Sequence, residues 1–220
     1  MTQRILVVAP HGLDEVLGCG GVIAAASDAG VEVSLLILCG DGTGHDEARR
    51  AGTRKAADIL GIEHVSFFEA PENKTDTVPL GDLVGAVEDA VKTFTPDTVY
   101  APHQGNLNID HQNGFKATAT ALRPVPGQPV TAFYAYEILS STDWAAPGYC
   151  VPFVPTRYVD ITAQLDRKLA ALAVYGGEMR LEPHARSITS VRRRALSLGA
   201  TVGVEAAEAF VTVREIVRRN

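Results

Sequence analysis

The sequence contains few cysteines and no excess of basic residues. Its three cysteines, Cys19, Cys39 and Cys150, are odd in number and form no CxxC pair, which argues against a disulfide framework and a zinc knuckle. The formal net charge of −6 argues against a nucleic-acid partner, because phosphate binding needs clustered Lys and Arg. One basic cluster, at 192–194, is interpreted as a solvated helix face, with a pocket for an anionic group as the alternative.

Long apolar runs and nucleotide-binding loops are also missing. No apolar stretch approaches the roughly 18–20 residues that cross a bilayer, so no membrane span is predicted. Residues 1–4 lead directly into a strand-like segment without the apolar region of a signal peptide, and we therefore expect a cytoplasmic protein. The glycine-rich stretches match neither GxGxxG nor the P-loop pattern, which argues against a nucleotide cofactor.

The remaining composition is typical of one α/β domain, which we expect to span 1–220. Apolar runs typical of strands alternate with longer helical patterns, the order of βαβ units that feed a parallel sheet. We therefore predict a three-layer, Rossmann-like fold with a mostly parallel sheet and helices on both faces. Strands are expected at 4–9, 32–38, 64–69, 97–101, 130–137, 156–161 and 209–214, and helices at 15–29, 46–60, 80–94, 111–122, 162–176 and 187–199.

Polar side chains with metal-binding chemistry follow two of the predicted strands. His11 and Asp14 come after the first strand, and the segment 100–111 after the fourth strand supplies His103, Asp110 and His111. Because the first and fourth strands of a doubly wound sheet commonly lie side by side, the two loops are expected to meet. A His, Asp and His set around an open position is typical of a catalytic zinc site. Helix capping and ordinary hydrogen bonding are the alternative for each residue alone.

The two segments together resemble a known family. The stretch PHGLDEVLGCGG at 10–21 is similar to the PHPDDE signature of the PIG-L/LmbE family of zinc-dependent N-deacetylases, and NIDH at 108–111 is similar to the family's HPDH motif. The resemblance extends over nearly the whole chain. It implies an LmbE-like fold and a metal held by His11, Asp14 and His111, with Zn²⁺ as the expected ion and Fe²⁺ as another divalent candidate.

Two departures from the family pattern affect the expected chemistry. Leu13 replaces the aspartate that the resemblance identifies as the general base, and leucine cannot accept a proton. Asn108 replaces a histidine implied in oxyanion stabilisation, although an asparagine can still donate a hydrogen bond there. Asp110 is the first candidate for a substitute base, with orientation of His111 as the alternative. Asp41 is the second candidate, with a turn role as the alternative.

Five further residues complete the predicted site. His184 is a candidate general acid or a plain loop residue, and Arg186 is a candidate grip for a phosphate or carboxylate or a surface salt-bridge partner. His103 and Glu137 are expected on the substrate side of the site, with a plain loop histidine as the alternative for the first. Trp144 could stack on a sugar ring or pack a loop.

The expected function is hydrolysis of an amide. The resemblance implies a metal-dependent N-deacetylase that removes an acetyl group from an N-acetylglucosamine-type amino sugar or its conjugate, and it is compatible with a homo-oligomer. The departures at Leu13 and Asn108 leave two alternatives open: a sugar-binding relative without turnover, or a zinc hydrolase of another bond.

Overall fold

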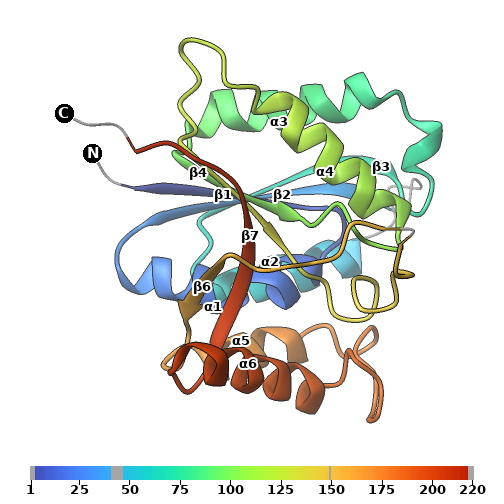
Figure 1. The fold of residues 1–220 in the computed structure, drawn as a ribbon. Helices are drawn as coiled ribbons and strands as arrows, with labels where there is room; N and C mark the ends of the chain where they lie inside the picture. Colours follow the sequence, from blue (N-terminus) through green and yellow to red (C-terminus); the bar gives the residue numbers. More distant parts are fainter. Residues whose placement is uncertain (1–2, 41–46, 149, 218–220) are drawn as a thin grey trace.

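The centre of the protein is a seven-stranded sheet with the order β3-β2-β1-β4-β5-β7-β6 (Figure 1). The computed structural model describes residues 3–40, 47–148 and 150–217. The strands are β1 (Arg4–Ala9), β2 (Glu32–Gly40), β3 (His64–Pro71), β4 (Thr98–Pro102), β5 (Ala132–Tyr136), β6 (Arg157–Asp160) and β7 (Ala207–Glu215).

Most neighbouring strands run parallel, as predicted. β1 pairs in parallel with β2 and β4, and the parallel pairing continues to β3 and β5 at either side. Among the seven strands of the described residues, β7 alone runs in the opposite direction, between β5 and β6. The central strands are almost continuously buried because helices cover both faces of the sheet, which explains their uninterrupted apolar sequences.

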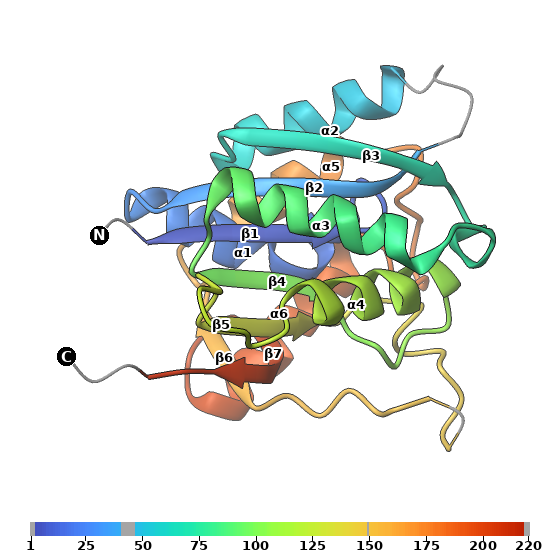
Figure 2. The same cartoon turned by 90° about the horizontal axis from the view of Figure 1, so that it is seen from above.

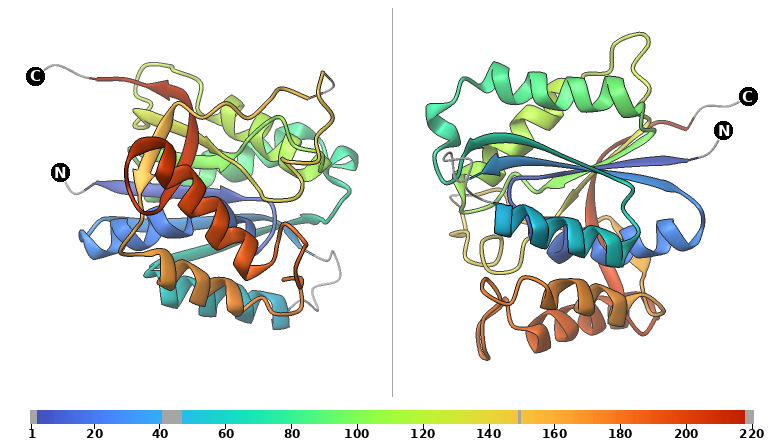
Figure 3. Two further views of the ribbon diagram at one scale, coloured as in Figure 1. Left: turned by 60° about the horizontal axis from the view of Figure 1, so that its bottom comes forward. Right: turned by 180° about the vertical axis from the view of Figure 1, so that it is seen from behind.

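The helices form a layer on each face of the sheet, and the predicted three-layer α/β fold is confirmed (Figures 1 and 2). α5 packs on α1 and α2, and α6 packs against α5 on the outside of the molecule (Figure 3). No helix in the described ranges has the length and apolarity to cross a membrane. One face holds α1 (Asp14–Asp28), α2 (Glu47–Leu60), α5 (Leu165–Ala173) and α6 (Ile188–Val202), and the other holds α3 (Leu80–Phe94), α4 (Ile109–Ala121) and the short η1 (Thr75–Thr77).

The observed boundaries of α4, α5 and α6 differ from the predicted ones, and α6 continues past the expected end at 199 to Val202. The helix expected at 162–176 is shorter, because turns occupy the residues on either side of α5 and glycines follow at 176 and 177. The helix expected at 111–122 begins earlier, at Ile109, because Asn108 caps it: the Asn108 side chain accepts a hydrogen bond from the Asp110 N–H.

The first helix is interrupted, and a buried ion pair repairs the interruption. Cys19 has non-helical dihedral angles, φ −141° and ψ 18°. The Glu208 carboxylate on β7 accepts the N–H groups of Gly21 and Val22, each at 2.8 Å. Lys168 on α5 donates to the Leu17 carbonyl at 2.8 Å and to Glu208 at 2.6 Å. A carboxylate and an ammonium from distant segments therefore satisfy backbone groups at the interruption.

Glycines in this helix serve close packing. A Cβ atom at Gly18 would overlap the ring of Tyr136, and one at Gly21 would overlap the side chain of Ile161. The missing side chains let α1 lie directly against the sheet and the segment after β6. Packing therefore accounts for two of the glycines that follow the first motif.

Removal of the ammonium from the buried pair should destabilise the whole fold. In Lys168→Met, Glu208 keeps a charge at a site where the side chain is 4% exposed, and its partner is gone. We expect a loss of about 3–5 kcal/mol in the free energy of unfolding, measured by urea denaturation. The control Arg192→Met removes an exposed pair with Asp166 and should cost about 0–1 kcal/mol. Equal losses in the two variants would contradict this account of the ion pair.

Candidate functional site

The parallel pairing of β1 with β4 brings the two sequence motifs to one edge of the sheet. Val7 lies opposite Tyr100 in the register, so the chain leaves both strands at neighbouring points. β2 flanks β1 on one side and β4 on the other, which makes this the topological switch point of the sheet. The predicted adjacency of the first and fourth strands is confirmed.

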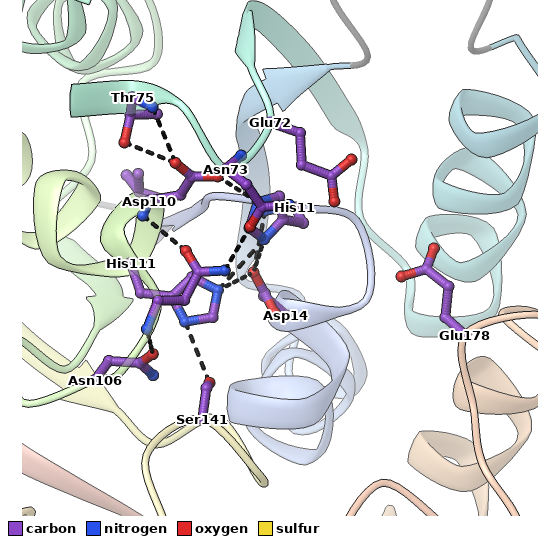
Figure 4. Close-up of polar contacts among 12 residues, drawn as sticks. His11, Asp14, Glu72, Asn73, Thr75, Asn106, Asp110, His111, Ser141 and Glu178 are labelled. Atoms are coloured by element: carbon purple, nitrogen blue, oxygen red, sulfur yellow. Dashed lines mark hydrogen bonds and ion pairs between the residues drawn. The ribbon is translucent and has the colours of Figure 1, made fainter. Parts of the chain in front are cut away.

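Three potential metal ligands converge at this edge (Figure 4). Asp14 Oδ2 lies 3.2 Å from His11 Nδ1 and 3.1 Å from His111 Nε2. The two imidazole nitrogens are 3.3 Å apart. His11 is on the loop after β1, Asp14 is the first residue of α1, and His111 is in the first turn of α4. Three donor atoms thus form a nearly equilateral triangle.

The triangle has the dimensions of a divalent metal site. Around a tetrahedral zinc ion with ligand bonds of about 2.0–2.1 Å, two donor atoms lie about 3.3 Å apart. The donors are also of the right kind, because imidazole nitrogen and carboxylate oxygen suit both zinc and Fe²⁺. The residues present therefore fit a divalent cation, with room for a further ligand from the pocket.

Asp110 binds the ring nitrogen of His11 that faces away from the other two ligands. Its Oδ2 lies 2.8 Å from His11 Nε2, which leaves His11 Nδ1 to face the other ligands. The same carboxylate accepts the Asn73 N–H at 2.5 Å, and the N–H and hydroxyl of Thr75 at 3.1 and 2.7 Å. Although burial opposes it, hydrogen bonds from His11, Thr75 and Asn73 lower the pKa of Asp110 to about 2. Cys39 lies near His11 and Asp110, and the three residues form a second group that could hold a metal ion. We do not assign a metal there, because the Asp110 carboxylate already has four hydrogen-bond partners.

These contacts revise the interpretation of Asp110. The sequence made it the first candidate for a substitute base, with orientation of His111 as the alternative. All of its hydrogen bonds point to other partners, and the histidine that it touches is His11. A carboxylate with a low pKa and occupied lone pairs is a poor proton acceptor, whereas a carboxylate behind a metal-binding histidine is a common orienting group. The geometry therefore favours orientation.

The two acidic residues at the start of α1 differ in charge. Asp14 faces His11 and His111, and, although burial opposes it, the charge of His111 and the hydrogen bonds with both histidines hold the pKa of Asp14 well below its usual range. Glu15 points the other way and accepts a hydrogen bond from the Tyr175 hydroxyl at 2.7 Å. Burial raises the pKa of Glu15 to about 8. Near neutral pH, Asp14 alone therefore brings a carboxylate charge to the cluster from this turn.

Leu13 occupies an unusual backbone position beside the ligands. Its φ of 97° lies in the left-handed region, which is rare for a residue with a branched apolar side chain. It is also the residue before the first turn of α1, and its side chain supplies no capping hydrogen bond. Leu13 is buried and lines the pocket at the metal ligands. The pocket wall is therefore apolar where the family motif has an acid.

The ligand cluster opens into a pocket of about 390 Å³. Three of the predicted site residues, Asn108, Trp144 and Arg186, line this pocket together with the ligands. Trp144 is 55% exposed at the rim. A larger groove of about 770 Å³ between β3 and α3 contains none of the predicted site residues. The smaller pocket is therefore the candidate site.

Four other predicted residues lie elsewhere or outside the described ranges. Glu137 forms a two-point ion pair with Arg194 at 2.8 and 2.6 Å, which we assign as a structural contact in place of substrate binding. His103 is buried, accepts the Gly105 N–H at 3.1 Å and does not line the pocket. His184 packs edge-on against the Trp144 ring, with ring centroids 5.4 Å apart. Asp41 is outside the described residues.

Two carboxylates that sequence reasoning missed also line the pocket. Figure 4 shows Glu72 near His11 and Glu178 farther from the ligands. Arg49 connects the two carboxylates, with contacts of 2.5 Å to Glu72 and 3.5 Å to Glu178. Burial raises the pKa of Glu178, and the Arg49 charge partly offsets that shift. Glu72 directly follows β3, so the rule that α/β sheets form their sites at the carboxyl ends of strands could have identified it. Glu178 lies in a turn after α5, and no sequence pattern marked it.

Comparison with known protein families and curated proteins identifies deacetylases. Residues 6–122 match the model of the PIG-L family, described as GlcNAc-PI de-N-acetylase. An uncharacterized deacetylase of Escherichia coli, YaiS, is 26% identical over 131 residues, which cover 56% of this chain and 70% of the relative. The diacetylchitobiose deacetylase of Thermococcus kodakarensis is 21% identical over 210 residues, 84% of this chain and 76% of the relative.

Solved structures share the fold over almost the full chain. The conserved protein TT1542 of Thermus thermophilus has a TM-score of 0.79 at 25% identity and covers 100% of this chain and 98% of its own. GalB, the 4-carboxy-2-hydroxymuconate hydratase of Pseudomonas putida, has a TM-score of 0.78 at 22% identity, with coverage of 100% and 99%. The N,N′-diacetylchitobiose deacetylase of Pyrococcus horikoshii has a TM-score of 0.77 at 20% identity, with coverage of 96% and 84%.

The ligand triangle predicts stoichiometric binding of a divalent cation. His111→Ala removes one donor and should abolish retention of zinc after dialysis, measured by elemental analysis. Asp110→Asn keeps the three donors but weakens the support of His11, and should lower zinc affinity about 10- to 100-fold in a competition titration. His64→Ala, an exposed histidine on β3, is the matched control and should bind zinc like the unaltered protein. Folded protein that never retains a divalent cation would contradict the assignment.

Proposed function

The chain belongs to the PIG-L family, and we propose that it is a metal-dependent N-deacetylase for an N-acetylglucosamine-type amino sugar or its conjugate. The observation that carries this proposal is the triangle of donor atoms, with sides of 3.1–3.3 Å, which opens into a pocket with an exposed tryptophan at its rim. Residues 1–220 act as one catalytic domain in this proposal. An amide carbonyl could bind at the metal ligands while a sugar ring contacts Trp144 at the rim.

The ligand cluster would hold the metal ion. His11, Asp14 and His111 supply the donors for zinc or Fe²⁺. When bound, such a cation polarises a carbonyl group and makes a water molecule more acidic. Asp110 keeps His11 in the orientation that directs Nδ1 to the cluster, and its negative charge makes that imidazole a better donor.

Asn108 can contribute to stabilisation of the oxyanion that develops on the amide oxygen. Its Oδ1 caps α4, and one N–H of its side chain donates to Asn73 Oδ1 at 2.9 Å. The side-chain amide has a second N–H, and Asn108 lines the pocket. A donor held in place before the reaction lowers the barrier, because no reorganisation is needed as the charge develops.

Glu178 is the best-supported proton acceptor among the described residues of the pocket. Leu13 has no acceptor, and Asp110 is committed to four hydrogen bonds. Glu72 is tied closely to Arg49, whereas the contact of Glu178 with the same arginine is longer. The raised pKa of Glu178 also makes its carboxylate a stronger base than an exposed glutamate. Asp41, which lies outside the described residues, is the second proposed acceptor.

His184 remains the proposed general acid for the departing amine. Its Nδ1 accepts the Arg186 N–H at 3.0 Å, so its other nitrogen is the one that could carry a proton to the substrate. The contact with Trp144 keeps this ring beside the rim of the pocket. A substrate bound against Trp144 would come close to His184.

Leu13 supports a second candidate function, the addition of water to an unsaturated carboxylic acid. A hydratase, GalB, shares the fold of this chain over its full length. A leucine in place of the motif's first aspartate is a departure from the deacetylase pattern, and metal-assisted activation of water serves hydration as well as hydrolysis. A sugar-binding protein without turnover remains the third interpretation.

The deacetylase proposal predicts metal-dependent release of acetate. Zinc-loaded protein should release acetate from at least one member of a panel of N-acetylated amino sugars, measured by an enzyme-coupled acetate assay. A chelator or Asp14→Ala should abolish the signal, because each removes the cation from the cluster. Tight sugar binding without acetate would support the binding protein, and hydration of a muconate-type acid without acetate would support the second candidate.

If Glu178 is the proton acceptor, its removal should lower kcat, and a new carboxylate at position 13 should restore part of the rate. Glu178→Gln should lower kcat about 10²- to 10⁴-fold with little change in KM, because general base catalysis contributes about that much. Leu13→Asp in the Glu178→Gln background should recover part of the rate by placing an acceptor beside the ligands. The control Glu182→Gln alters an exposed glutamate paired with Arg193 and should keep the full rate. Equal rates in Glu178→Gln and the control would remove Glu178 from the mechanism.

A further inference from the structure

Arg186 is a cation at the pocket wall with no counter-ion among the residues that the structure describes. Among the described residues, its guanidinium forms no hydrogen bond or ion pair, and its Nε is buried without a partner. The arginines of the following helix behave differently, because each has a carboxylate partner. These pairs are Arg192 with Asp166, Arg193 with Glu182, and Arg194 with Glu137. The basic cluster at 192–194 is therefore neutralised, whereas Arg186 in the pocket has no such partner among the described residues.

The backbone around Arg186 is held in place by its neighbours. Its N–H donates to His184 Nδ1, and the His184 ring packs against Trp144. Its carbonyl accepts the Arg180 N–H at 3.2 Å. Ser187 then caps α6 by accepting the Ser190 N–H. Arg186 and Trp144 thus belong to one connected wall, with a cation and an exposed aromatic ring facing the same pocket.

The local electrostatics favour an anion near Arg186. The first turn of α6 contains no acidic residue, so the positive end of the helix dipole reinforces the arginine charge. The acids that line the pocket elsewhere have their own partners: Asp14 faces the two histidines, and Glu72 and Glu178 face Arg49. A buried guanidinium nitrogen without an acceptor is unfavourable, so a ligand that supplies the acceptor gains binding energy there.

We infer that the substrate carries an anionic group, a carboxylate or a phosphate, that binds Arg186 while its ring contacts Trp144. This inference rests on the proposed function, because it adds a required acidic group to the N-acyl amino sugar. A guanidinium can bind the two oxygens of either group with parallel hydrogen bonds, which also fixes the orientation of the substrate. The acyl group at the metal ligands and the acid at Arg186 would then define the two ends of one molecule.

The test compares matched sugars that differ in charge. Methyl N-acetylglucosaminide is neutral, N-acetylglucosamine 1-phosphate carries a phosphate, and N-acetylmuramic acid carries a carboxylate. We expect kcat/KM for at least one anionic sugar to exceed that of the neutral sugar about 10- to 100-fold, the usual effect of one charged hydrogen-bonded contact. The arm with the larger rate distinguishes phosphate from carboxylate. Equal rates for all three sugars would overturn the inference and leave the deacetylase proposal intact.

Substitution of Arg186 tests whether this residue causes the preference for anionic sugars. Arg186→Gln should bring kcat/KM for the anionic sugars down to that of the neutral sugar, mainly through a higher KM, and Arg186→Lys should retain part of the preference. The control Arg192→Gln should keep the full preference, because Arg192 is paired with Asp166 on the surface. An anionic preference that survives in Arg186→Gln would overturn the role of this residue.

Binding to the metal-free protein separates this inference from the proposed function. Isothermal titration of the same sugars measures affinity without turnover. Weaker binding of an anionic sugar to Arg186→Gln, in a panel that releases no acetate, would support the anion site while the deacetylase proposal fails. Equal affinities of the anionic and neutral sugars in the unaltered protein would overturn the anion site. Circular dichroism and zinc content confirm that each variant is folded.

Discussion

Parallel hydrogen bonding between β1 and β4 is the constraint on which the candidate site depends. The two strands are distant in sequence, and their pairing alone brings the loop with His11 to the helix with His111. The burial of both strands makes their register costly to change, because a shift would misplace apolar side chains on both faces. The spacing of the ligand triangle therefore follows from the packing of the sheet, and the ligands need little rearrangement to receive a cation.

The sequence was sufficient for the fold and for the core of the cluster. Continuous apolar runs such as the one in β2 indicated buried parallel strands. The expectation that polar residues at the carboxyl ends of adjacent strands meet predicted that the two motifs lie together. The identity of the three ligands came from resemblance to a family. Their mutual distances of 3.1–3.3 Å add a geometric argument that does not depend on that resemblance.

The rest of the site depends on contacts that a linear sequence does not contain. Asp110 is beside His111 in the chain, yet its carboxylate reaches back to His11, because the start of a helix turns neighbouring side chains in different directions. Glu137 was expected to contact a substrate, but it forms an ion pair with Arg194 on α6. Glu178 lines the pocket from a turn after α5 that no sequence pattern marked as part of a site. In each case a tertiary partner decided the role.

The contact of Glu208 with the interrupted first helix has a consequence for the order in which the chain can assemble. Glu208 is 187 residues from Gly21, whose N–H it accepts, and Lys168 is 151 residues from the Leu17 carbonyl that it binds. During synthesis the first helix therefore emerges long before the groups that complete its hydrogen bonds. Asp14 begins this same helix. This candidate ligand therefore lies in a helix whose interrupted backbone finds its distant hydrogen-bond partners only after α5 and β7 have been made.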